Sequence, residues 1–556
     1  MRLAGLAGTR AGHRARRAGR GRRLVAAAAG LAAAASAGGM IVGVPAASAS
    51  TSETVIVTSS GQLSPVTAVL DVLGTVLAQF QIINGVEASI PAILEPVLAA
   101  LPGITVTPDV SVNVESAAES TGPHTPSDEF LQQTGATGLA AAGDTGQGVT
   151  VAVIDTGIDN LPDFAGRLIG GVDLTGGNSP FQDDYGHGTF VAGLIAGDGA
   201  SSGGEYSGEA PGADLVSIKV AGASGTTDLV RLILGLQWAI LNRPADNIRV
   251  VNMSLGFRPF ESTALNPLDQ AVQAAWTSGI AVVTSAGNAG PSNGTILSPG
   301  DDPLAITVGA EDDQAQPAAA DDEMTNFSSA GPTTPDGWAK PDLVTSGRSV
   351  VSLAAPGSTV YNQNPSARIG SASFVGSGTS FSSAITSGAA ALVLADNPGL
   401  SPDELKARLL ATTSHGPVGN PFVDGHGVLN AYAAATAGPM NLSQSTFGLL
   451  PVLPGVTVSL SPAGSPVDTW NAGLWSGVAW PQASPGGPAW GGSGWNGSAW
   501  NGFAWTSRAW NDGGWQGAAW NGQAWDGSAW DGSAWTGSAW NGAAWSGGAW
   551  NASEWN

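Results

Sequence analysis

The sequence predicts an α/β protein whose main part is a mostly parallel sheet with helices on both faces. Apolar runs of strand length alternate with helical patterns from Gly148 to about Ala437, and such alternation is typical of βαβ units. The runs are nearly continuous, as expected of strands buried on both faces. A small α+β unit without Lys or Arg precedes this part, and a low-complexity Trp/Gly repeat tail follows it.

The composition excludes several classes of function. The chain has 20 Lys and Arg against 43 Asp and Glu, which gives a net charge of −23 and argues against a nucleic-acid partner. It contains no cysteine, so a disulfide scaffold, a thiolate metal site and a cysteine nucleophile are excluded.

Residues 1–49 are interpreted as a signal peptide, which predicts a secreted, extracellular protein. Eight arginines lie within the first 23 residues, and an uncharged, Ala-rich stretch runs from Leu24 to Val44. Ala47-Ser48-Ala49 then supplies the small-x-small pattern that precedes signal cleavage. The alternative is a membrane anchor, because the apolar stretch is about long enough to span a bilayer.

Residues 50–125 predict the small α+β unit. Strands are expected at residues 54–58, 86–90 and 104–106, and helices at 65–83 and 92–101, from the period of their apolar residues. The stretch from Ser120 to Ser127 is polar and contains Gly and Pro, as in a cleavable linker.

Within residues 126–440 the pattern predicts the larger α/β domain. Strands are expected at 149–154, 215–220, 248–253, 280–284 and 305–308, and helices at 229–241 and 268–276. Ser401, Pro402 and Glu404 predict a further helix start, with an N-cap, a proline at the first position and a capping box.

Three short motifs carry residues suited to nucleophilic hydrolysis. Asp155 ends a predicted buried strand and is followed by Thr156-Gly157, His187 stands in Gly186-His187-Gly188-Thr189, and Ser380 follows Gly378-Thr379 before an Ala-rich helix. Hydrolysis by a serine needs a hydroxyl, a neighbouring base and a group that orients the base. Each residue alone has a simpler explanation as a helix cap or a structural hydrogen-bonding group. Their joint occurrence in the order Asp, His, Ser, each at a strand–helix junction, favours a catalytic triad.

These motifs make the segment 128–437 resemble a subtilase, a serine peptidase of the subtilisin type. Further stretches are also similar to that family: Asn252-Met253-Ser254-Leu255-Gly256, Ser285-Ala286-Gly287-Asn288, Lys340-Pro341-Asp342-Leu343 and Gly425-His426-Gly427. The sequence departs from the family pattern at Phe381 and Ala384, where Met and Pro are usual, and in Val344-Thr345-Ser346-Gly347, which lacks the usual Ala-Pro. We expect the helix after Ser380 to remain intact.

The resemblance implies a subtilisin-like fold and a serine endopeptidase that needs no cofactor for catalysis. It implies that Ser380 is the nucleophile, His187 the base and Asp155 its orienting group, and that Asn288 donates to the oxyanion. It further implies that Ser254, Leu255 and Gly256 bind the substrate backbone, and that Ala286 and Gly287 form another wall of the pocket for the residue before the cut.

The small unit at 50–125 resembles the inhibitory propeptide of this family. It would act on its own chain as an intramolecular inhibitor and a folding aid, and the precursor would cut itself before about Asp128. The resemblance also implies that the mature enzyme acts on protein or peptide substrates. Structural Ca2+ is also compatible with the family, and acidic pairs occur at Asp183-Asp184, Asp301-Asp302, Asp312-Asp313 and Asp321-Asp322. No pair has a recognisable ligand spacing, so we assign no metal ligands.

Residues 441–469 are expected to be a linker, and residues 470–556 form the repeat tail. Trp recurs at every fifth position from Trp470 to Trp555 except at Pro485. The tail could be an adhesive segment that contacts the cell envelope or a polysaccharide through its indoles, a narrow β-solenoid of stacked coils, or a linker. The first interpretation would retain the enzyme at the cell surface. An alternative function for the whole chain is a catalytically idle protein that binds surfaces through this tail.

Overall fold

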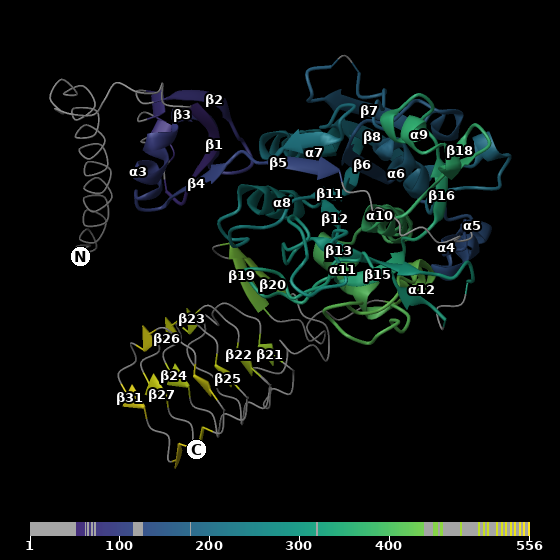
Figure 1. Ribbon diagram of the computed structural model, residues 1–556. Coiled ribbons are helices and arrows are strands. Elements are labelled where there is room, and N and C mark those ends of the chain that lie inside the picture. Colours follow the sequence, from purple (N-terminus) through teal and green to yellow (C-terminus); the bar gives the residue numbers. More distant parts are fainter. Residues whose placement is uncertain are drawn as a thin grey trace, which may run out of the picture. The chain divides into compact units, whose positions relative to one another are not determined.

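The computed structural model describes residues 52–114 and 126–438, apart from positions 62, 64–65, 68–69, 72–73, 178 and 318–320, together with short strands beyond residue 448. Two compact units are present, Met1–Val110 and Ser111–Asn556. Each is described by itself (Figure 1).

The first unit is built on an antiparallel sheet of four strands in the order β2-β3-β1-β4. The strands are β1 (Ser52–Ser59), β2 (Thr75–Gln79), β3 (Gly85–Pro91) and β4 (Ile104–Pro108). The 3-10 turn η1 (Ala92–Leu94) and the helix α3 (Glu95–Ala99) lie between β3 and β4. Val55, Val57, Val86 and Ile90 are among the residues of its buried core. The three predicted strands and the second helix of this unit are confirmed.

The predicted helix at 65–83 is wrong in its second half. The Gly74 N–H still donates to the Leu70 carbonyl at 2.8 Å, as at a helix end. Residues Thr75–Gln79 instead form β2, which pairs with β3. A Cβ at Gly74 would lie 2.5 Å from the Ser89 carbonyl oxygen of β3, so a glycine permits this close approach. Pairing with a distant strand overrode the local helical period.

The second unit contains the predicted parallel sheet, with the strand order β14-β13-β12-β10-β6-β8-β7 and β15 paired to β13. The strands are β6 (Thr150–Asp155), β7 (Leu168–Asp173), β8 (Asp214–Lys219), β10 (Ile248–Met253), β12 (Ala281–Ser285), β13 (Ile306–Asp312), β14 (Glu323–Met324) and β15 (Leu343–Ser346). Only β14 runs antiparallel to its neighbour in this sheet. All five strands predicted from continuous apolar runs are confirmed, and β6 and β12 are buried along their whole length.

Helices pack on this sheet in two groups. The first group is α7 (Leu229–Asp246) and α8 (Pro267–Thr277), which contact each other and the strands β6, β10 and β12. The second is α6 (His187–Ala196) and α10 (Thr379–Asp396), which contact each other, with α10 lying on β10, β12, β13 and β15. The helix α10 is continuous through Ala384, so the absence of the usual proline leaves it intact as expected.

The remaining elements complete this unit. The helices are α4 (Phe130–Gln133), α5 (Ala136–Ala142), α9 (Thr359–Gln363), α11 (Pro402–Ala411) and α12 (Ala431–Thr436), with the 3-10 turns η2 (Pro162–Phe164), η3 (Ala200–Ser202) and η4 (Pro365–Ala367). A small sheet joins β16 (Val350–Leu353), β18 (Ser373–Gly376) and β17 (Arg368–Ile369). The capping box predicted at Ser401 and Glu404 is present at the start of α11.

A separate sheet of three short strands matters for the site. Its order is β11-β5-β9, formed by β11 (Leu255–Gly256), β5 (Ser111–Val114) and β9 (Thr226–Asp228). The central strand β5 runs antiparallel to both neighbours. It lies inside the predicted propeptide, yet it belongs to the second unit.

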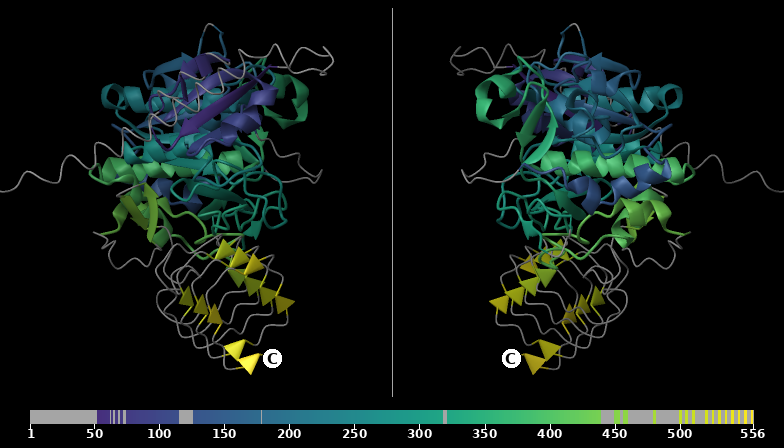
Figure 2. Two further views of the ribbon diagram at one scale, coloured as in Figure 1. Left: turned by 90° about the vertical axis from the view of Figure 1, so that its left-hand side faces the viewer. Right: turned by 90° about the vertical axis from the view of Figure 1, so that its right-hand side faces the viewer.

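Short strands also recur in the tail. Two-residue strands such as β22 (Ala499–Trp500), β25 (Ala519–Trp520) and β29 (Ala539–Trp540) pair in parallel, Trp500 with Trp520 and Trp520 with Trp540. The same step of four pentads relates β23 (Ala504–Trp505), β26 (Ala524–Trp525) and β30 (Ala544–Trp545). Figures 1 and 2 show these strands in rows. The stacked-coil interpretation of the tail stays a prediction.

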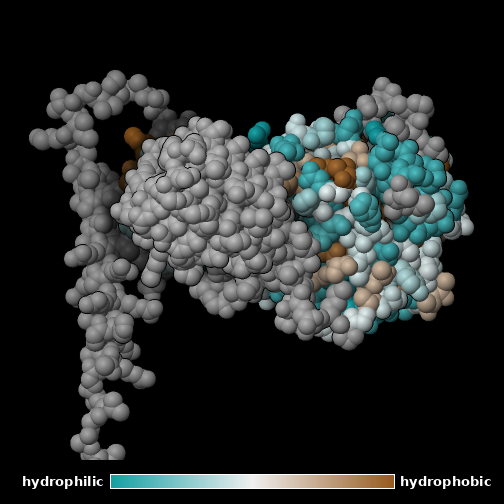
Figure 3. Space-filling view, turned by 90° about the horizontal axis from the view of Figure 1, so that it is seen from below, coloured by the Kyte–Doolittle hydropathy of each residue, from teal (hydrophilic) through white to brown (hydrophobic). Residues whose placement is uncertain are grey.

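The surface of the second unit is mostly polar where Figure 3 shows its described residues, with small apolar patches between. Within the described part of the chain, no helix is both long and apolar enough to cross a membrane. The predicted signal peptide at 1–49 lies outside the described residues.

Candidate active site

Asp155 is the last residue of β6, and its side chain is fully buried. Its Oδ1 atom accepts a hydrogen bond of 2.8 Å from the N–H of Thr156. Both carboxylate oxygens lie 2.9 Å from Nδ1 of His187. Since a carboxylate only accepts hydrogen bonds, Nδ1 carries the proton and Nε2 is left as the basic nitrogen.

His187 opens the helix α6 and is 4% exposed. The preceding Gly186 has a φ of 106°, a conformation that residues with a side chain rarely adopt. A Cβ at this position would also collide with the Ser358 hydroxyl. Among the described residues, the buried Nε2 atom of His187 has no hydrogen-bond partner.

Ser380 lies in the first turn of α10, where the positive end of the helix dipole favours negative charge. It is completely buried, and its Oγ donates a hydrogen bond of 3.2 Å to the carbonyl of Ser254. The next residue, Phe381, packs its ring 5.7 Å from the His187 imidazole, measured between centroids. The structure therefore brings the histidine and the residue after the serine into contact, while the serine hydroxyl points to Ser254. Catalytic hydrogen bonds are often formed only when substrate is bound.

Asn288 is fixed to the residue that precedes Ser380. Its Oδ1 accepts hydrogen bonds from the N–H of Thr379 at 2.9 Å and from the Thr379 hydroxyl at 3.1 Å. The same hydroxyl accepts a bond of 3.1 Å from the N–H of Gly287. These contacts identify the oxygen end of the Asn288 amide, so its nitrogen is the end that can donate to an oxyanion.

A buried hydroxyl network holds α10 against β10 and β11. Ser254 Oγ lies 2.9 Å from the Ser380 carbonyl and 2.9 Å from Ser383 Oγ, and it accepts a bond of 2.8 Å from Asn252 Nδ2. Ser387 Oγ donates to Asn252 Oδ1 at 2.9 Å. Ser254 thus positions the helix start that carries Ser380, a role that sequence reasoning did not assign to it.

The sequence-predicted substrate residues surround these groups. Leu255 and Gly256 form β11, where Leu255 pairs with Val114 and Gly256 with Asn113 of β5. Ala286 is buried and accepts a hydrogen bond from the N–H of Leu297, and Gly287 follows it. All nine predicted site residues therefore come from the end of β6, the start of α6, the segment of β10 and β11, the loop after β12 and the start of α10.

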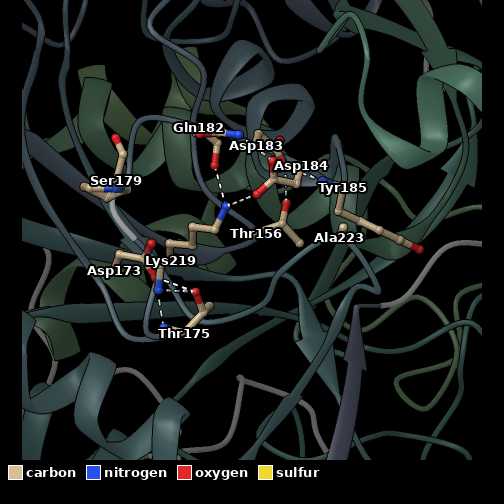
Figure 4. A network of polar contacts seen from close by, with 12 residues as sticks. Thr156, Asp173, Thr175, Ser179, Gln182, Asp183, Asp184, Tyr185, Lys219 and Ala223 are labelled. Atoms are coloured by element: carbon tan, nitrogen blue, oxygen red, sulfur yellow. Dashed lines mark hydrogen bonds and ion pairs between the residues drawn. The ribbon is translucent and has the colours of Figure 1, made fainter.

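Sequence reasoning missed the residues that hold the loop before His187. Asp183 was considered there only as half of an acidic pair, but its buried carboxylate organises this loop (Figure 4). Oδ1 accepts hydrogen bonds of 2.7 Å from the Thr156 hydroxyl and from the N–H of Gly186, and Oδ2 accepts one of 2.8 Å from the N–H of Thr189. Burial raises the pKa of Asp183, and the hydrogen bonds from Gly186, Thr189 and Thr156 oppose that rise.

Lys219, the last residue of β8, binds the same loop before His187. Its buried ammonium donates to the Gln182 carbonyl at 2.5 Å and to Asp184 Oδ2 at 2.9 Å (Figure 4). The hydrogen bond and the charge of Lys219 lower the pKa of Asp184. Because Thr156 follows Asp155 and Gly186 precedes His187, Asp183 and Lys219 together set the distance between base and orienting carboxylate.

We expect Asp183→Ala to lower kcat by about 10- to 100-fold, since a displacement of about 1 Å at a catalytic group has effects of this size. The change leaves three buried donors unpaired, each at a cost of about 1–3 kcal/mol. Steady-state kinetics and thermal melts check this, with Asp184→Asn as the matched control. Asp184 is partly exposed, and such ion pairs contribute about 0–1 kcal/mol. Equal kcat values for Asp183→Ala and the control would contradict the positioning role.

At least one member of each acidic pair considered for calcium makes other contacts. Asp302 accepts from Gln273 Nε2 at 2.8 Å and from the N–H of Leu304 at 2.7 Å. Asp312 lies 3.4 Å from Arg348, and Asp322 accepts from Gln133 Nε2 at 2.8 Å. The described ranges hold no group of three or more His, Asp or Glu arranged to bind a metal ion. Calcium binding stays a prediction.

One of these carboxyl groups predicts a pH dependence of stability. Burial and the neighbouring charge of Asp302 raise the pKa of Asp301 from 3.8 to about 8. A raised pKa in the folded state means that this group stabilises the fold fully below pH 4 and loses that contribution as the pH rises through about 8. We therefore expect Asp301→Asn, in a Ser380→Ala background that prevents self-digestion, to raise the melting temperature more at pH 9 than at pH 4. An equal shift at both pH values would refute this.

Comparison with known proteins gives concordant matches. The model of the subtilase family matches residues 146–444. The chain is 43% identical over 292 residues to the serine protease AprX of Bacillus subtilis, a match that spans 52% of this chain and 66% of AprX. It is 36% identical over 309 residues to subtilisin E of the same species, spanning 55% of this chain and 70% of that protein.

A solved structure shares the fold. The chain matches the crystal structure of fervidolysin from Fervidobacterium pennivorans, described as a keratinolytic enzyme related to subtilisin, with a TM-score of 0.57. The match covers 72% of this chain and 62% of that one, at 22% sequence identity. At this identity the likeness concerns the fold alone.

Proposed function

The chain belongs to the subtilase family of serine endopeptidases, and we propose that it hydrolyses protein substrates outside the cell with Ser380 as the nucleophile. The observation that carries the assignment of residues is the buried Asp155–His187 pair, with Nδ1 at 2.9 Å from both carboxylate oxygens. This pair lies beside the helix start that holds Ser380, through the contact between His187 and Phe381.

In the proposed reaction, Ser380 Oγ attacks the peptide carbonyl as His187 Nε2 removes its proton. His187 then gives the proton to the amine nitrogen as the C–N bond breaks, which leaves the acyl group on Ser380 Oγ. A water molecule that gives its proton to His187 attacks this ester, and His187 returns a proton to Ser380 Oγ as the C–Oγ bond breaks. Asp155 holds the imidazole in the tautomer with a basic Nε2 and stabilises the cation that forms. Asn288 Nδ2 and the N–H of Ser380 stabilise the oxyanion, and the loss of one such donor typically costs ~10²–10³ in turnover.

The substrate backbone would bind as a strand between β9 and β11. An extended peptide can add to an exposed strand through main-chain hydrogen bonds. The chain's own β5 supports this mode, because Val112 pairs with Thr227 of β9 while Asn113 pairs with Gly256 of β11. The N–H of Val114 also donates to the Gly225 carbonyl at 2.9 Å.

We infer that β5 is the end of an inhibitory propeptide that occupies this substrate position in the precursor. The bond cut during maturation would then lie between Val114 and Ser127, close to the boundary at 125 that the sequence suggests. The small sheet β2-β3-β1-β4 would be the body of this propeptide, released after the cut. Secretion would follow from the predicted signal peptide at 1–49.

The repeat tail at 470–556 would hold the mature enzyme at a cell envelope or a polysaccharide. The recurrence of Trp at every fifth residue supports a binding role over that of a linker. The competing idea of an idle surface-binding protein does not account for a buried Asp–His pair beside a helix start that carries a serine.

Labelling with a fluorophosphonate tests the proposed function, because the reagent reacts with an activated serine. Matured protein should incorporate one label at Ser380, identified by peptide mapping, and should digest casein until it is labelled. Protein that has the native melting transition but neither takes up the label nor digests casein would overturn the assignment.

A further inference from the structure

One side chain lies between the two walls of the pocket that would receive the side chain before the cut. The segment of Leu297 and Ser298 is hydrogen-bonded to both walls. The N–H of Leu297 donates to the Ala286 carbonyl at 3.0 Å. Ser298 exchanges two hydrogen bonds with Phe257, the residue after β11, at 2.9 and 3.1 Å.

The Leu297 side chain itself contacts a glycine of each wall. A Cβ placed on Gly287 would lie 2.6 Å from Leu297 Cγ and 2.9 Å from Cδ1. A Cβ placed on Gly256 would lie 2.9 Å from Leu297 Cβ and 3.3 Å from Cδ1. The side chain thus occupies the space above both glycines, and Leu297 is only 9% exposed.

We propose that Leu297 closes this pocket from within and restricts the enzyme to substrates with Gly, Ala or Ser before the cut. The inference rests on the proposed function, since it concerns the residue whose carbonyl Ser380 attacks. The two glycines leave room that a larger incoming side chain could enter, and the leucine fills that room. To seat an aromatic ring, the Leu297 side chain and its segment would have to move. That segment is held by backbone hydrogen bonds on both sides, and forcing extra volume into a packed site is destabilising.

The chemistry of the closed pocket is consistent with this restriction. Leu297 offers an apolar surface, and Gly256 and Gly287 offer backbone, so the pocket selects by size. The peptide backbone on either side is bound independently, through β9 and β11, so short side chains can still be positioned for attack.

The test compares two chromogenic peptides that differ only before the cut, succinyl-Ala-Ala-Pro-Ala-p-nitroanilide and succinyl-Ala-Ala-Pro-Phe-p-nitroanilide. Matured wild type should have a kcat/KM at least 10-fold higher for the Ala peptide. Leu297→Gly should move the Ala-to-Phe ratio at least 30-fold toward Phe, and Leu297→Ala should fall between. Changes of one or a few methylenes in an apolar pocket have effects of about 10- to 200-fold.

Ile296→Gly is the matched control, because it frees the same backbone segment without removing the side chain between the glycines. It should leave the Ala-to-Phe ratio of kcat/KM within about threefold of the wild-type ratio, well below the expected effect of Leu297→Gly. Fluorophosphonate labelling of each variant separates a change of specificity from a loss of the folded site.

The proposal is overturned if wild type cleaves the Phe peptide as well as the Ala peptide. It is also overturned if labelled Leu297→Gly and Leu297→Ala keep the wild-type ratio. If wild type neither cleaves either peptide nor takes up the label, the proposed function itself has failed, and the restriction fails with it.

Discussion

Ser380→Ala is expected to leave the purified precursor whole, while the wild-type chain shortens itself over time. The reason is that Ser380 Oγ is the only atom that forms the bond to the peptide carbonyl in the proposed mechanism. Removal of a catalytic serine typically lowers turnover by about 10⁶-fold, which leaves only the residual rate due to binding and oxyanion contacts. Intact mass spectrometry of the two proteins, followed over hours, measures the outcome directly.

A neighbouring serine provides the control for this experiment. Ser382 lies on the same helix and is also buried, but its Oγ donates to the carbonyls of Thr345 and Ser346 at 3.1 Å. Ser382→Ala should therefore mature like wild type, with a new N-terminus between residues 115 and 127. Self-cutting of the Ser380→Ala precursor at the wild-type rate and position would disprove the assignment of the nucleophile.

Asp155→Asn is expected to lower kcat by about 10⁴-fold without unfolding the protein. An amide at this position keeps the size of the carboxylate but places a donor where Nδ1 of His187 now donates. The imidazole would then carry its proton on Nε2 and could not accept the proton of Ser380. The positive charge that forms on His187 during the reaction would also lose its buried counter-charge.

Steady-state kinetics with the Ala peptide, together with thermal melts, check this second result. Asp173→Asn is the matched control, because Asp173 also ends a parallel strand, β7. Its carboxylate accepts hydrogen bonds from the N–H and the hydroxyl of Thr175 (Figure 4). It should retain activity within a few-fold of wild type. A kcat for Asp155→Asn close to that of the control would mean that His187 does not depend on Asp155.

The class of fold and the place of each chemical group along the elements could be predicted from the sequence. Asp155 ends β6, His187 opens α6 and Ser380 lies in the first turn of α10, as their motifs predict. These features depend on short-range signals: continuous apolar runs, glycines at sharp turns and caps at helix starts. Such signals act over a few residues, so they can be recognised without knowing which distant segments will meet.

The features that depend on contacts between distant segments could be seen only in the folded chain. Thr75–Gln79 became a strand because β3 offered it hydrogen bonds, although its local period favoured a helix. Val112 and Asn113 came to lie between β9 and β11, and the carboxylate of Asp183 met the hydroxyl of Thr156.

Leu297 likewise filled the space between Gly256 and Gly287, a contact among three segments that no local pattern predicts. Strand register, burial and side-chain packing are set by the partner as much as by the residue itself. The sequence therefore predicted which groups could perform the chemistry, while the packing of the chain decided how they are held and which side chains the pocket has room to accept.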